Sequence, residues 1–229
     1  LFATPAQQEI ASYFWDRFEK IIQPQLASLR TTVNYNDAHE LNLLVNDEGE
    51  SPTICGVIDF GDALHTHLVN ELAIACAYGV MGLPDPLTAA CQLTQSFHQV
   101  QPLTEAEVVV LFEMIAARLL ITVASAAHNQ QAEPDNEYLQ VSAQPAWEVL
   151  QKWRKIPPAQ AHYRLREACG WEPVPQRTAF DRWLATQPAI APVMPWAGRP
   201  TISLDLGVGS LDLGNNENFL TIQPFARTV

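Results

Sequence analysis

The sequence predicts an α+β fold that is mostly helical, and three observations support this. Apolar residues recur at the three- and four-residue spacing of helices on both sides of a short central segment. That segment, residues 31–59, instead has short apolar runs separated by turn-forming residues, as strands do. Caps, first-turn prolines and a glycine mark several helix ends. With 229 residues, 48% of them hydrophobic, the chain is large enough for one or two domains.

The first predicted helix begins at Thr4. The run Thr4-Pro5-Ala6-Gln7 provides a capping Thr, a proline at the first helical position and a Gln that completes a capping box. Apolar residues then follow at helical spacing, at positions 10, 13, 14, 18, 21 and 22. Pro24 should end or kink this helix, because proline lacks the backbone N–H that a helix interior needs.

Three short strands are predicted next, over residues 31–35, 42–46 and 53–59. The acidic, glycine-containing segment 47–50 lies between the last two strands. We therefore expect strands 42–46 and 53–59 to form a hairpin.

The rest of the first 170 residues is predicted to be helical. Helices are expected over 67–82, from Asp85-Pro86, and from the capping box Thr104–Glu107. The last of these is apolar nearly all round, which predicts a position at the centre of a helical bundle. Further helices are expected at about 136–143, 145–155 and 157–169, with Gly170 as a C-terminal cap.

Residues 171–229 have a different composition and hold seven of the seventeen prolines. One short helix is predicted around 180–186, and strands at 201–206, 211–213 and 219–223. The segment has too few apolar positions for a core of its own. We interpret 1–170 as one domain, and 171–229 as a proline-rich linker with the opening strands of a following module.

The net charge limits the classes of partner that the protein could bind, and the cysteines indicate its cellular compartment. A net charge of −12 and a pI near 4.8 argue against binding to nucleic acid or an anionic membrane. No run of about 18 apolar residues appears, so no membrane-spanning helix is expected. The start lacks the features of a secretory signal. The four cysteines are far apart and are expected to be reduced thiols, with Cys76 and Cys91 buried, which favours a cytoplasmic protein.

The candidate site residues lie at the ends of the predicted strands. Asp37 precedes a strand that starts at Asn42, and Asp59 ends the next strand. Phosphoryl transfer needs one group that accepts or orients a hydroxyl proton, together with oxygen ligands for a magnesium ion on the nucleotide phosphates. Asp37 is the predicted catalytic residue, and Asn42 and Asp59 are the predicted Mg²⁺ ligands, because carboxylate and amide oxygens suit this cation. No nucleotide-binding residue can be named from the sequence.

In this segment the chain resembles the aminoglycoside phosphotransferase, choline kinase and hydroxylysine kinase family. The family pattern is H-G-D-x-x-x-x-N followed by I-D-F-x-D, and here Asp37, Asn42, Asp59 and Asp62 occupy the matching positions. The resemblance implies a protein-kinase-like C-terminal lobe in residues 1–170, the roles given above, Mg²⁺, and ATP or GTP as phosphate donor. Asp62, His39 and Tyr35 are supporting residues, and Tyr35 stands where the family has His.

The resemblance also has consequences for what surrounds the chain. Family members carry an N-terminal lobe with a phosphate-covering loop, whereas thirty-six residues precede Asp37 and no glycine occurs before Gly49. That lobe is therefore expected to be missing from this chain. The tail after Gly170 is similar to large bacterial fusion proteins that continue into a zinc-peptidase-like module and a class III aminotransferase. The neighbouring domains of such a polypeptide would be partners.

The predicted function is transfer of a nucleotide γ-phosphate to a hydroxyl of a small, amine-bearing and hence cationic metabolite, by the intact protein rather than by this fragment alone. A non-catalytic pseudokinase or scaffold within a multidomain aminotransferase-containing enzyme is the alternative. Binding of Mg²⁺-ATP distinguishes the two. A third interpretation, a metallohydrolase, would use His39, His65 and His67 with the nearby aspartates.

Overall fold

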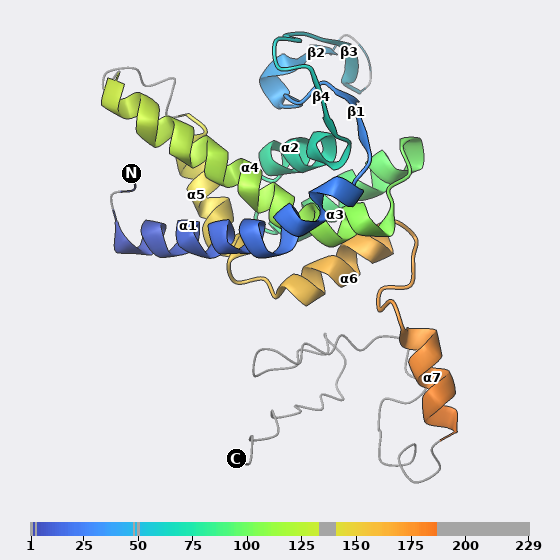
Figure 1. Cartoon of the computed structure of the whole chain (residues 1–229). Coiled ribbons are helices and arrows are strands. Elements are labelled where there is room, and N and C mark those ends of the chain that lie inside the picture. The colour runs from blue at the N-terminus through green and yellow to red at the C-terminus, as the bar shows by residue number, and fades with distance from the viewer. Residues whose placement is uncertain (1, 3, 48, 50, 133–140, 187–229) are drawn as a thin grey trace. The chain divides into compact units, whose positions relative to one another are not determined.

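The computed structural model describes residues 2, 4–47, 49, 51–132 and 141–186 (Figure 1). The chain divides into two compact units, Leu1–Ile156 and Pro157–Val229. The sequence places a boundary at residue 170 instead, so the helix over Pro158–Ala168 groups with the second unit. The predicted helix at 136–143 and the predicted tail strands lie largely or wholly outside the described residues.

The first helix, α1 (Pro5–Arg17), begins as predicted. The Thr4 hydroxyl accepts a hydrogen bond from the Gln7 backbone N–H, and the Gln7 side chain accepts one from the Thr4 backbone, which is a complete capping box. One turn of π-helix (Phe18–Ile22) and a 3₁₀ segment (Gln23–Ser28) follow. The regular helix therefore ends before Pro24, as expected from the missing donor of that proline.

Four strands form two separate two-stranded antiparallel sheets. Strand β2 (Leu43–Asn46) pairs with β3 (Thr53–Val57), which confirms the predicted hairpin. Strand β1 (Thr31–Asn34) pairs with β4 (Leu64–His67). The prediction that residue 67 starts a helix was wrong, because residues 64–67 find a strand partner in β1. Helix α2 starts two residues later and spans Val69–Gly79.

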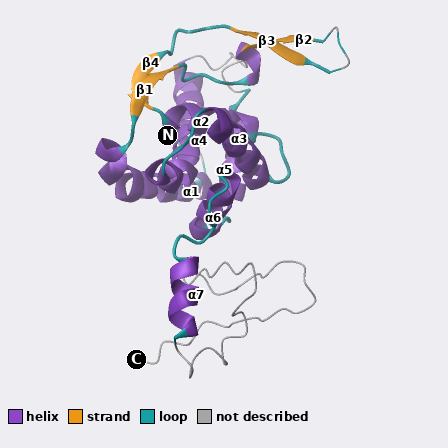
Figure 2. Ribbon diagram, turned by 90° about the vertical axis from the view of Figure 1, so that its right-hand side faces the viewer, coloured by secondary structure: helices purple, strands orange, loops and turns teal. Residues whose placement is uncertain are grey.

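The core of the first unit is a helical bundle around α4 (Glu105–Ala132). Helix α4 packs against α1, α2 and α5 (Ala143–Trp153), and α3 (Pro86–Val100) packs on α2. The predicted central position of α4 is confirmed. The largest fully buried side chains of this unit are Trp153, Phe112, Ile22, Leu72, Leu111, Ile115, Leu119 and Leu150. Both figures show the strands gathered at one end of this bundle, beyond α2 (Figures 1 and 2).

By length and composition, residues 105–130 of α4 would also suffice to cross a membrane. This test by length and composition does not contradict the expectation that the chain has no membrane-spanning helix, because the core helix of a globular protein can pass it as well. The sequence predicts this helix, but Glu107, Glu113 and Arg118 interrupt its apolar run, so it contains no unbroken stretch of about 18 apolar residues. Its packing is that of a core helix, since buried Glu107 and Glu113 form ion pairs with Arg30 and Arg17.

The second unit contains α6 (Pro158–Ala168) and α7 (Arg177–Ala185). Gly170 has a φ of +73°, the left-handed conformation that glycine adopts after a helix end, so the predicted cap is confirmed. Helix α7 corresponds to the short helix predicted around 180–186. The described cysteines are all free thiols, and Cys76, Cys91 and Cys169 are buried.

Glu107 joins a capping box to a buried ion pair, and its replacement by glutamine is expected to destabilise the fold. Its carboxylate accepts hydrogen bonds from Arg30 and from the Thr104 backbone N–H, at 2.7–2.9 Å. Burial raises the pKa of Glu107, but these bonds outweigh it and hold the pKa below its ordinary value. The ionised form therefore adds stability above pH ~4.5, and this contribution disappears as the pH falls through the lower folded-state pKa.

We expect Glu107→Gln to lower the free energy of unfolding by about 1–3 kcal/mol at pH 7, and by less near pH 4. Urea unfolding at the two pH values measures the difference. Glu9→Gln, at an exposed position on α1, is the control and should change stability by less than ~0.5 kcal/mol. An effect of Glu107→Gln that stays constant between the two pH values would contradict the role of the ionised carboxylate.

Candidate active site

Two loops bring the predicted site residues to one end of the β2–β3 hairpin. The first loop follows β1 and carries Asp37 into the short 3₁₀ turn Glu40–Asn42. The second loop follows β3 and carries Asp59. The Ile58 backbone N–H donates to the Asn42 carbonyl at 3.1 Å, so Asn42 and Asp59 leave the hairpin side by side. The chain order predicted from the sequence therefore places these residues together.

The carboxylate of Asp37 has three polar partners. The Asn42 amide Nδ2 donates to Oδ2 at 2.9 Å, and His39 Nε2 lies 3.3 Å from the same oxygen. The Arg118 guanidinium lies 3.5 Å from Oδ1, which is longer than a usual charge-assisted hydrogen bond. Oδ1 is therefore the less engaged of the two oxygens.

Arg118 and Tyr78 belong to this cluster, although sequence analysis did not identify them. Arg118 comes from α4 and donates to the Tyr78 hydroxyl at 2.9 Å, with its guanidinium carbon 5.3 Å from the Tyr78 ring centre. The His39 ring lies 5.1 Å from the same tyrosine ring. One signal was present in the sequence: Arg118 is the one Lys or Arg in α4, and a lone cation in an apolar helix needs a partner.

Asn42 and Asp59 present oxygen atoms suited to a hard cation. Asn42 is buried and donates from its Nδ2 to Asp37, so its amide Oδ1 is the atom of this side chain with the chemistry of a cation ligand. Asp59 is exposed, and its Oδ1 accepts the Gly61 backbone N–H at 3.3 Å. Mg²⁺ commonly takes one or two protein oxygens and completes its shell with waters and phosphates. The two side chains therefore fit the predicted ligand role.

Two residues of the site have left-handed backbone conformations that non-glycine residues seldom adopt. Asn36 has φ +65° and Asp59 has φ +57°. The Asn36 conformation is held by its backbone N–H, which donates to Glu71 Oε2 at 3.0 Å, and by its side chain, which donates to the Asp62 carbonyl at 3.3 Å. Such residues cluster where the surrounding structure must fix a functional side chain.

Tyr35 connects the two loops. Its hydroxyl donates to the Ile58 carbonyl, and its ring meets Phe60 edge-on at 5.1 Å. Partial desolvation raises the pKa of Tyr35, and the negative charges of Asp37, Asp59 and Glu71 raise it further. Tyr35 thus stays a protonated donor and has the geometry of the supporting residue predicted for it. Asp62 contributes its backbone carbonyl to the loop.

The histidines do not form a metal site with the aspartates. His65 and His67 lie in β4, opposite Val33 and Thr31 of β1, while His39 lies at Asp37. Within the described residues no group of three or more His, Cys, Asp or Glu side chains could hold a metal ion. This arrangement does not favour the metallohydrolase interpretation.

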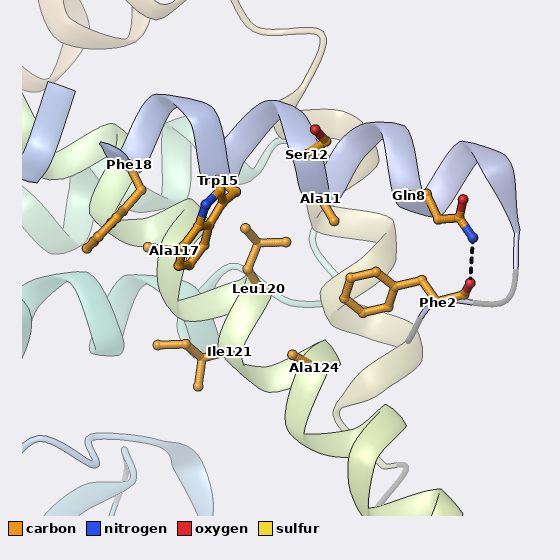
Figure 3. A pocket seen from close by; sticks show the side chains of 10 residues that line it. All are labelled: Phe2, Gln8, Ala11, Ser12, Trp15, Phe18, Ala117, Leu120, Ile121 and Ala124. Carbon is orange, nitrogen blue, oxygen red and sulfur yellow. Dashed lines mark hydrogen bonds between the residues drawn. The ribbon is translucent and has the colours of Figure 1, made fainter. Parts of the chain in front are cut away.

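A separate apolar pocket of about 550 Å³ lies between α1 and α4 (Figure 3). Trp15, Phe18 and Leu120 contribute to its walls, and Gln8 and Ser12 are polar residues at its lining. It has no titratable side chain and contains none of the predicted site residues. The lining of this pocket therefore offers no side chain for acid–base chemistry.

Comparison with known proteins points to the same segment. Residues 3–103 match the sequence profile described as the phosphotransferase enzyme family. The chain is 29% identical to the hydroxylysine kinase of Mus musculus and 30% identical to that of Xenopus laevis, in each case over 151 residues. Each alignment covers 63% of this chain and 40% of the relative. The hydroxylysine kinase of Danio rerio is 29% identical over 138 residues, 59% of this chain and 39% of that protein.

The chain thus spans about 40% of the length of the curated relatives that it matches. No solved structure matches it significantly. The matched residues 3–103 contain every residue predicted for the site, from Tyr35 to Asp62. Over this segment the chain is similar to the phosphotransferase enzyme family.

Proposed function

We propose that this chain belongs to the phosphotransferase family and forms the catalytic half of a small-metabolite kinase, which transfers a nucleotide γ-phosphate to a hydroxyl group. The observation that carries the proposal is the convergence of Asp37, Asn42 and Asp59 at one end of the hairpin. The family match and the hydroxylysine kinase relatives support it. A hydroxylated amino acid is accordingly the first acceptor to test.

Each residue has a role that its contacts support. Asp37 orients the acceptor hydroxyl and accepts its proton through Oδ1, while Asn42 and His39 hold Oδ2. Tyr35 and Glu71 fix the two loops. Asn42 and Asp59 would hold Mg²⁺, and that ion would neutralise the phosphates of bound ATP or GTP.

We further propose that the nucleotide lid comes from sequence outside this chain. The relatives are longer than the matched region, and the two small sheets and their loops expose large apolar side chains, namely Val33, Leu44, Val45, Ile54, Ile58, Phe60 and Leu64. Exposed apolar groups beside a polar site are usual where another part of a protein or a ligand covers them. The larger polypeptide, in our proposal a cytoplasmic multidomain fusion with peptidase-like and aminotransferase modules, would supply that cover.

A non-catalytic scaffold is the second candidate. Tyr35 in place of the family's His favours it, but the hydrogen bonds of Tyr35 satisfy the supporting role of that position. Retention of Asp37, Asn42 and Asp59 in one cluster favours the kinase.

Calorimetry of Mg²⁺-ATP and Mg²⁺-GTP binding to the full-length protein containing this chain tests the proposal, followed by assay of phosphate transfer to 5-hydroxylysine and other hydroxylated amines. We expect micromolar to millimolar binding that requires the metal. Asp59→Asn should weaken Mg²⁺-nucleotide binding by about 10–100-fold, because it removes a charged ligand. Asp47→Asn, in the exposed hairpin turn, is the matched control. Absence of nucleotide binding by the full-length protein would leave the scaffold as the better interpretation.

A further inference from the structure

Arg118 has more hydrogen-bonding capacity than its contacts use. A guanidinium carries five N–H donors in a planar fork. Within the described residues, its polar contacts are the hydrogen bond from one Nη to the Tyr78 hydroxyl and the long contact of 3.5 Å to Asp37 Oδ1. Its Nε is buried and has no hydrogen-bond partner. Buried unpaired donors are uncommon and call for an explanation, such as a group that binds there.

The unused N–H donors of Arg118 lie beside Asp37, where the proposed acceptor hydroxyl would bind. Arg118 contacts Oδ1, the oxygen of Asp37 that is free to receive a substrate hydroxyl. The Arg118 side chain is 23% exposed and the Asp37 side chain 18%, so both are partly accessible to solvent. A molecule whose hydroxyl bonds to Asp37 therefore places its neighbouring atoms within reach of the guanidinium.

The charge of Arg118 disfavours an amine of the acceptor next to it. An amine next to Arg118 would meet a like charge close by in a partly desolvated site. Several acidic groups that could balance an amine are already engaged: Glu113 pairs with Arg17, Glu107 with Arg30, and the Asp85 carboxylate caps α3. Beside Asp37, a purely cationic acceptor would therefore meet the permanent positive charge of Arg118.

We propose that Arg118 is a specificity-determining residue that binds a carboxylate of the acceptor, so that the substrate is a hydroxylated amino acid rather than an amino alcohol. This rests on the proposed function. The guanidinium fork matches a carboxylate with two parallel N–H···O bonds. Tyr78 stacks beside the guanidinium and holds it in place. Arg118 lies on α4, outside residues 3–103 that match the family profile.

Calorimetry on the full-length protein tests the proposal without turnover. The probes are 5-hydroxylysine and L-serine, each compared with its carboxamide, in which the negative charge is removed. We expect the wild type to bind at least one carboxylate form about 10–100-fold more tightly than its amide, the range of a charge-assisted hydrogen-bonded pair. In Arg118→Gln this preference should fall to less than about 3-fold. Arg154→Gln, an exposed arginine stacked on Tyr13, should retain the wild-type preference.

Three outcomes overturn the proposal: equal binding of carboxylate and amide by the wild type, no binding of either carboxylate, or an equal loss for both forms in Arg118→Gln. The last outcome would make Arg118 a positioning residue for Asp37. Thermal unfolding of the variant, within a few degrees of wild type, shows that it folds, and Arg118→Lys provides a second variant that keeps the charge but loses the fork. If the protein prefers the carboxylate form but transfers no phosphate, the kinase proposal is refuted and the carboxylate-binding role of Arg118 is not.

Discussion

Asp37→Asn is expected to reduce phosphate transfer by the full-length protein by about 10²–10⁴-fold, the usual contribution of a general base. The substitution keeps the shape of the side chain and one acceptor oxygen, which Asn42 can still bond, but removes the charge that accepts the hydroxyl proton. Because Asn42 and Asp59 are untouched, Mg²⁺-nucleotide binding should change by less than about 3-fold. Steady-state transfer rates and calorimetry on the same preparation measure the two effects.

The design of this experiment separates chemistry from folding. Asp47→Asn removes the same charge from the exposed hairpin turn and should leave the rate within about 2-fold of wild type. Asp37→Asn could disturb the contacts of His39 and Arg118, so its circular dichroism and thermal unfolding should be compared with those of the wild type. A folded Asp37→Asn variant with nearly full transfer activity would refute the assigned role.

Trp153→Ala is expected to cause the largest loss of stability, about 3–5 kcal/mol in the free energy of unfolding. Trp153 is fully buried at the end of α5, and its ring stacks on Phe112 of α4 with ring centres 4.8 Å apart. Its indole N–H donates to the Phe112 carbonyl at 3.1 Å. The truncation leaves a cavity in the centre of the bundle and removes the indole hydrogen bond between α5 and α4.

Urea unfolding followed by circular dichroism measures this loss, and Trp15→Ala is the matched control. Trp15 is 57% exposed, so its removal should cost less than half as much. Trp153→Phe should fall between the two, because it keeps the stacked ring but loses the indole donor. Equal effects of the two alanine variants would contradict the central position of Trp153.

The features predicted correctly from the sequence are those specified by neighbouring residues. The capping boxes at Thr4 and Thr104 depend on residues three positions apart, and both form. The β2–β3 hairpin follows from two short strands around an acidic turn. Asp37 and Asn42 are close in sequence, so their contact is specified locally as well.

The features that the sequence did not predict depend on residues far apart in the chain. Residues 64–67 form a strand because β1 is their partner, and an isolated His-x-His segment gives no sign of that pairing. The contact of Arg118 with Asp37 requires that α4 be packed against α2 and the site loop, which no spacing rule provides. The exposure of the hairpin strands was also not predicted. Val45 and Ile54 are apolar, yet they are 53% and 64% exposed.

The β2–β3 hairpin has a consequence for how the site behaves over time. It is a sheet of two strands, each with a single hydrogen-bonded neighbour, and isolated two-stranded ribbons are marginally stable in water. Opening of such a ribbon costs little free energy compared with global unfolding, so its amide hydrogens should exchange early. Asn42 and Asp59 stand at the base of this ribbon. A ligand that bridges them also ties the ribbon closed, which couples occupancy of the site to order in the strands that carry it.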